Sequence, residues 1–181
     1  MVYNKKDEYF VLFKPINPKK KTQSPIGEKV FHNYDSSLFI FKINTCHLIA
    51  NALIAPLMLP YWLENGLIIF CSDKILDNKS VKNESLTFLK NEDYGEMSQY
   101  SFLNTNRGEF VYNYVKGYWT VRYLEEEYPG FLKETFKTYK GEDVVRMIVE
   151  KLGLDTTDDE KMWIQLDELL YNHYKHLLET E

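Results

Sequence analysis

Residues 43–63 form a run without a formally charged side chain, and two prolines divide it. The run is about as long as a bilayer span. The run holds, among others, Asn44, His47, Asn51, Pro56 and Pro60. Such residues are costly in hydrocarbon, whereas apolar residues at three- and four-residue steps before Pro56 are typical of a helix. We therefore predict a buried helix over residues 45–55 and a loop between the prolines, with no membrane contact.

The residues before this run favour strands and those after it favour helices. Aromatic and β-branched residues indicate strands at residues 8–13, 28–32 and 37–43. The helical spacing predicts helices at residues 45–55, 61–75, 109–128, 131–139, 142–152 and 157–178. Residues 77–107 are polar and carry no assignment. We expect one domain over residues 1–181, strand-rich over 1–43 and helical over 44–181. The predicted fold is α+β, with a small, mostly antiparallel N-terminal sheet.

Three local signals refine the helices. Asn44 or Thr45 can cap the first helix. Thr157, followed by Glu160 three residues later, fits a capping box and predicts the start of the last helix. Gly117 is a weak point within the helix at 109–128, because Gly costs about 1 kcal/mol relative to Ala in a helix interior.

Composition narrows the class of protein. The chain has 181 residues, a formal net charge of -5 and 2 cysteines. A mildly acidic chain is a poor general ligand for nucleic acid, because neutralising phosphates needs clustered Lys and Arg. Cys46 and Cys71 cannot build a disulfide scaffold or a four-thiolate zinc site. The first residues lack the apolar segment of a signal peptide, so we expect a cytoplasmic protein that contacts neither nucleic acid nor membrane.

Two short segments have an order and spacing found in zinc peptidases. Residues 47–53 read HLIANAL, and residues 60–67 read PYWLENGL. Further on, residues 118–128 read YWTVRYLEEEY, and Leu152-Gly153-Leu154 leads into a last helix that contains Trp163. Over about residues 36–178 the chain resembles small gluzincin-type, peptidase-MA-like domains. Those domains have a helix with H-E-x-x-H, then a second helix that opens Pro-x-Trp-Leu-x-Glu-Gly-Leu-Ala. The resemblance implies a zincin-like fold.

The chemistry of that motif depends on a few side chains. Two His four residues apart project from one face of a helix, and they can share a zinc ion at about 2.0–2.1 Å from each nitrogen. The Glu beside the first His is the general base that takes a proton from zinc-bound water. A carboxylate on the second helix completes three protein ligands and leaves one position for water.

This chain departs from the motif at three of those positions. By the resemblance, His47 matches the first ligand, Leu48 replaces the base, Asn51 replaces the second His and Asn65 replaces the ligand Glu. Leucine cannot accept a proton, and neutral amides are poor zinc ligands. Glu64 is one residue from the ligand position, and one helical step turns a side chain by about 100°. We expect no metal and no catalytic residue, with His47 as the weak metal candidate.

The resemblance thus implies a catalytically inactive domain that keeps its cleft as a binding or scaffold surface for an unknown protein or peptide. Glu64 and Tyr118 are our candidates for the cleft, Tyr118 because a downstream Tyr can steady an oxyanion in such peptidases. One alternative is a metal-dependent hydrolase with rearranged ligands. It would use zinc held by His47, Glu64 and a residue of the 77–107 segment, such as Glu92, Asp93 or Glu96. The other is a small interaction protein of unrelated ancestry, in which His47 and Asn51 hydrogen-bond to each other or to backbone and Trp62 is a core residue. A topology that lacks two adjacent helices at 45–55 and 61–76 beside a strand at 37–43 would favour this alternative.

Other candidates have ordinary explanations. His173 and His176 lie three apart on the last helix and could offer two metal ligands, but we find no third ligand for them. Lys19, Lys20 and Lys21 form a basic turn. Tyr112, Tyr114, Tyr118 and Tyr123 could line a cleft or pack in the core. Cys71 is a small buried hydrophobe by its setting, because no basic residue adjoins it.

Overall fold

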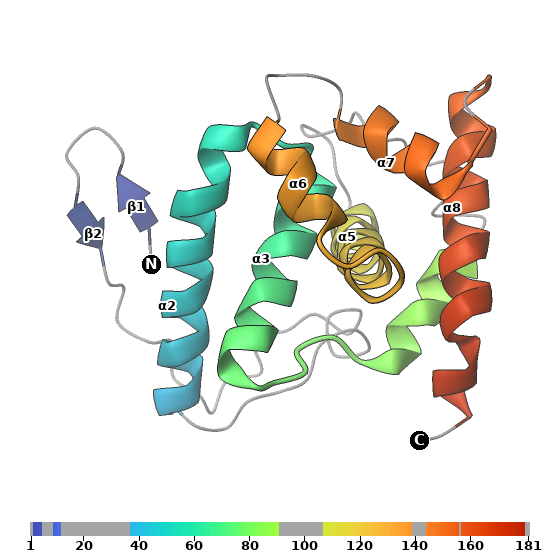
Figure 1. The fold of residues 1–181 in the computed structure, drawn as a ribbon. Helices are drawn as coiled ribbons and strands as arrows, with labels where there is room; N and C mark the ends of the chain where they lie inside the picture. The colour runs from blue at the N-terminus through green and yellow to red at the C-terminus, as the bar shows by residue number, and fades with distance from the viewer. Residues whose placement is uncertain are drawn as a thin grey trace.

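The computed structural model describes residues 2–4, 9–11, 37–90, 107–138, 144–155 and 157–179. The strands are β1 (Val2–Asn4) and β2 (Tyr9–Val11). The α-helices are α2 (Ser37–Ile54), α3 (Tyr61–Leu76), α5 (Arg107–Glu127), α6 (Phe131–Thr138), α7 (Val144–Leu152) and α8 (Asp159–Tyr174). The 3-10 helices are η1 (Ala55–Leu57), η2 (Asn83–Lys90) and η3 (Lys175–Leu178). Figure 1 shows α2 and α3 side by side, α5 crossing between α3 and α8, and the hairpin beyond α2.

The prediction of an α+β fold with an N-terminal sheet is wrong. Over the described residues the elements are helices, apart from one antiparallel hairpin in which Val2 pairs with Val11. Two three-residue strands make a ribbon, which is too small to form a layer of a core. The predicted strand at 37–43 is the first part of α2. The strand expected at 28–32 lies outside the described residues, whereas the one at 8–13 contains β2.

The segment at 37–43 is helical because propagation of a helix is cheap once a nucleus exists. Its aromatic and β-branched residues disfavour a helix by less than about 0.7 kcal/mol each, and the residues that follow have a helical period. The cap predicted at Asn44 or Thr45 is therefore wrong as well. Both residues lie inside α2, where the Thr45 hydroxyl donates to the carbonyl of Phe41 at 2.8 Å. The helix α2 does end as predicted, because Pro56 falls in η1 and Pro60 precedes α3.

The helices α3 and α5 cross at a pair of glycines. A Cβ atom added to Gly66 would overlap the backbone of Gly117, and one added to Gly117 would overlap the carbonyl oxygen of Trp62. The two backbones therefore touch, which only residues without a side chain permit. Gly117, expected to be the weak point of its helix, is the position that allows this contact.

The helix α8 and the short helix η2 close the other side of α5. Trp119 on α5 is fully buried, and its indole N–H donates to the hydroxyl of Ser85 in η2 at 2.9 Å. Its ring lies 4.8 Å from that of Tyr174 on α8, centroid to centroid. The segment without an assigned structure thus supplies a core element. The buried residues of η2 are Asn83, Ser85, Leu86, Phe88 and Leu89.

The start of α8 differs from the capping box that the sequence predicts. Asp158, and not Thr157, is the N-cap residue, and its carboxylate accepts from the backbone N–H groups of Glu160 and Lys161. The Thr157 hydroxyl instead donates to Asp155 at 2.7 Å. Asp is as good an N-cap as Thr, and a carboxylate also suits the positive end of the helix dipole.

Candidate functional site

The peptidase-like frame lies on the antiparallel pair of helices α2 and α3, which pack against each other (Figure 1). The apolar residues that α3 contributes to the frame, Trp62, Leu63 and Leu67, are buried in the core. The glycine of the frame, Gly66, is the residue on which α5 crosses. These four residues are thus placed by packing, so the frame has a structural explanation that needs no catalysis.

His47 is half-buried on α2. Its Nε2 atom is buried and finds no hydrogen-bond partner among the described residues. Burial lowers the pKa of His47, and the negative charge of Asp73 on α3 opposes that effect. Because this pKa lies below the ordinary 6.5, the imidazole is mostly neutral at neutral pH. The neutral form is the one that binds metals or accepts a proton.

The Asp73 carboxylate is already hydrogen-bonded to residues of the turn that follows α3. Its carboxylate accepts from the Ser80 backbone N–H at 2.8 Å, from the Ser80 hydroxyl at 2.5 Å and from the Asn78 side chain at 3.1 Å. These bonds hold the end of α3, where Asp77 adopts a left-handed conformation with φ of 48°. The charge that acts on His47 therefore belongs to a helix terminus.

The three changed positions of the motif have different surroundings. Leu48 is half-buried and Asn51 is exposed on α2. Asn65 on α3 is half-buried, and its amide nitrogen donates to the carbonyl of Tyr61 one turn earlier at 2.7 Å. Because Asn65 bonds to its own helix, it serves the local backbone.

Glu64 on α3 and Tyr118 on α5 each lie within two positions of a glycine of the crossing. Burial raises the pKa of Glu64, and its charge acts on Tyr114 of α5, whose pKa is raised mainly by burial. Tyr118 is buried, with its ring centroid 5.3 Å from Trp119 and 6.4 Å from Phe70. Burial, and next the charge of Asp73, raises the pKa of the Tyr118 hydroxyl to about 12. At neutral pH this phenol therefore stays protonated.

No group of three or more metal-ligating side chains comes together in the described ranges. Glu92, Asp93 and Glu96, the candidates for a third ligand beside His47 and Glu64, lie outside those ranges. Within them, no helix has the length and apolar character needed to cross a bilayer.

The remaining candidates are placed as follows. The Nε2 atom of His173 lies 3.6 Å from the Glu127 carboxylate, and its ring packs edge-on against Tyr123. The Nδ1 atom of His176 lies 2.9 Å from the carbonyl oxygen of His173. Cys71 is half-buried, and burial together with the charge of Glu125 raises its pKa. The residues Lys19, Lys20 and Lys21 lie outside the described part, as does the side chain of Tyr112.

The structure contains a buried ion pair that we did not predict from the sequence. The Lys116 ammonium on α5 lies 3.2 Å from the Asp167 carboxylate on α8, with side chains that are 6% and 8% exposed. The ammonium also sits 4.5 Å from the centre of the Trp163 ring. Burial lowers the pKa of Lys116, and Asp167 opposes the shift. The sequence does carry a signal of this pair. Asp167 stands at helical spacing between the apolar residues Trp163 and Leu170, so a charged side chain lies on the buried face of α8.

No protein-family model, curated protein or solved structure matches the chain. The likeness to gluzincin-type domains therefore depends on the residues at 47–53 and 60–67 and on the looser agreement downstream.

Proposed function

We propose that this chain is a non-catalytic, zinc-peptidase-like domain of the cytoplasm that acts as a binding or scaffold module for a protein or peptide. The observation that supports it most directly is that the frame's packing residues lie in the core, whereas its former ligand positions do not form a site within the described residues. Trp62, Leu63 and Gly66 are core residues, whereas Asn51 is exposed and Asn65 bonds to its own helix. The packing half of the motif is kept and the catalytic half is missing.

The proposal predicts that the site can be rebuilt. The triple variant Leu48→Glu, Asn51→His, Asn65→Glu places a base and two ligands beside His47. If the helix pair has the peptidase arrangement, this variant binds zinc with near-stoichiometric occupancy by elemental analysis, whereas the unmodified chain binds none. The control carries Gln at the same three positions, which preserves polarity and bulk without strong ligands. A folded triple variant that takes up no zinc would contradict the peptidase-like part of the proposal.

The same preparation tests the rearranged metal site. Near-stoichiometric zinc in the unmodified chain, purified without chelator, would overturn the non-catalytic proposal. His47→Ala and Glu64→Gln would then each be expected to release the metal, because three protein ligands are the usual minimum of a zinc site.

One observation favours the second candidate, an interaction protein of unrelated ancestry. The peptidase comparison calls for a strand at 37–43 beside the first helix, and this segment is the start of α2. If the ancestry is unrelated, Asn65→Glu removes the amide that donates to the Tyr61 carbonyl and creates no ligand. The triple variant would then lose stability relative to the Gln control and bind no zinc, so the rebuilt site separates the two candidates.

A further inference from the structure

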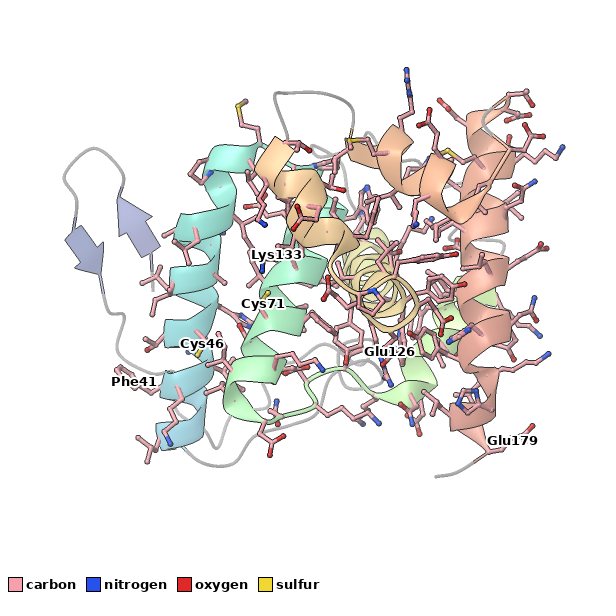
Figure 2. The ribbon with its side chains drawn as sticks, viewed as in Figure 1. Phe41, Cys46, Cys71, Glu126, Lys133 and Glu179 are labelled. Atoms are coloured by element: carbon pink, nitrogen blue, oxygen red, sulfur yellow. The ribbon has the colours of Figure 1, made fainter. Side chains whose placement is uncertain are left out.

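The outward face of α2 carries a row of apolar side chains. Leu38, Phe41, Ile49 and Leu53 are all exposed, although they follow one another at helical steps with Thr45 between them. Figure 2 shows Phe41 projecting away from α3, toward the side on which the hairpin lies. Apolar side chains that line up on one face of a helix, unlike single surface hydrophobics, are typical of an interaction site.

The β1–β2 hairpin requires an apolar surface to pack against. A two-stranded ribbon is marginally stable in water unless it packs on a helix or a further strand. The sequences of its strands, Val-Tyr-Asn and Tyr-Phe-Val, are mostly apolar or aromatic. The strand β1 already contacts α2. Both elements therefore gain by burying apolar surface against each other.

The chain connectivity allows this contact along the whole helix. Residues 12–36 join β2 to the first residue of α2. At about 3.3–3.6 Å per residue this connection can span more than the roughly 27 Å length of α2.

We propose that the stripe formed by Leu38, Phe41, Ile49 and Leu53 is the docking face of the β1–β2 hairpin of the same chain. The hairpin is the cover of α2, and the contact between β1 and α2 is its point of attachment. This inference is independent of the proposed function, since it involves none of the motif positions 47, 48, 51 and 65.

Hydrogen exchange on the full chain, read by mass spectrometry, tests the assignment. We expect the backbone amides of residues 2–11 to be protected in the unmodified chain, and to exchange at least tenfold faster in Ile49→Ser/Leu53→Ser. The control is Ile75→Ser/Ile164→Ser, which changes side chains of matched exposure (70% and 48%, against 73% for Leu53 and 51% for Ile49) on other helices. The control leaves hairpin exchange unchanged, and amides of α3 and α5 report that each variant is folded.

Three results would overturn the proposal. The first is hairpin amides that exchange at the rate of an unstructured chain in the unmodified protein. The second is equal hairpin protection in the α2 variant and the control. The third is a dimer, detected by light scattering, that Ile49→Ser/Leu53→Ser dissociates into monomers, because the occupant of the stripe would then be a second copy of the chain.

Discussion

The helices α2 and α3 are neighbours of similar apolar character, yet their surroundings are opposite. Half of α3 is buried, including Ile68 and Ile69, because α2 lies on one side and α5 crosses on another. In α2, among the side chains that the structure describes, Ala50 is the buried one, and Ile49 and Leu53 face outward. Burial of an apolar residue is thus decided by the number of partners its helix has, and not by its own hydrophobicity.

The difference separates two kinds of region. The packed body, formed by α3, α5, α8 and η2, has close backbone contact, buried aromatics and a buried ion pair. The helix α2 contributes one face to it and leaves another available. We therefore expect substitutions in the packed body to change global stability, and those on the outward face of α2 to affect the hairpin only.

The largest effect is expected at the buried ion pair. Asp167→Asn leaves the Lys116 charge buried without its counter-ion, and we expect the free energy of unfolding to fall by about 3–5 kcal/mol. Urea denaturation measures this. The double variant Lys116→Met/Asp167→Leu should recover most of the loss, because an apolar pair replaces both charges. Lys42→Met changes an exposed lysine of α2 and is the matched control. It should change the free energy of unfolding by less than about 0.5 kcal/mol. A small effect of Asp167→Asn would place the pair in solvent.

The same truncation on the two helices compares them directly. Ile69→Ala in α3 removes buried methyl groups and should lower the free energy of unfolding by about 3 kcal/mol. Ile49→Ala in α2 should lower it by less than about 1 kcal/mol, since Ile49 is half exposed. Thermal or urea unfolding of both variants decides the point. Equal losses would show that α2 is buried as fully as α3.

The glycine crossing gives a prediction opposite in sign to helix propensity. Gly117→Ala would stabilise an isolated helix by about 1 kcal/mol. Here the added methyl group meets the Trp62 carbonyl, and we expect a net loss of about 2 kcal/mol from overpacking. Asn51→Ala on exposed α2 follows propensity and should be neutral or slightly stabilising. A stabilised Gly117→Ala, by urea denaturation, would mean that α3 and α5 are further apart.

The smallest effect concerns pH. Burial raises the pKa of Glu126, but hydrogen bonds from Tyr174 at 2.6 Å and Arg122 at 2.8 Å, with the Arg122 charge, outweigh it and lower the pKa from its ordinary 4.5. A depressed carboxyl pKa stabilises the fold above the unfolded-state pKa, and this contribution is lost as pH falls through the folded-state value.

We therefore expect Glu126→Gln to lose less stability than the unmodified chain between pH 6 and pH 3. Solvent screening keeps the difference under about 1 kcal/mol. Unfolding free energies at both pH values measure it. Parallel losses in the two proteins would mean that these hydrogen bonds do not form in solution.

Much of the helical body could be predicted from the sequence. The helices at 61–76 and 107–127 follow apolar residues at helical spacing, and Pro56 and Pro60 separate α2 from α3 because proline removes a backbone donor. The strand predicted at 37–43 failed because β propensity is a weak preference, which the adjoining helix overrides. The polar segment at 83–90 has no clear period, so its buried role in η2 could not be foreseen.

The candidate site divides in the same way. The sequence by itself determined which residues stand at the motif positions, and hence that His47 lacks a base at Leu48 and a second imidazole at Asn51. Only the tertiary structure decided what these residues contact, because a contact between helices depends on crossing geometry and on partners distant in sequence. It placed Asp73 near His47, Gly66 against Gly117 and Lys116 beside Asp167, and it left Ile49 and Leu53 exposed on α2.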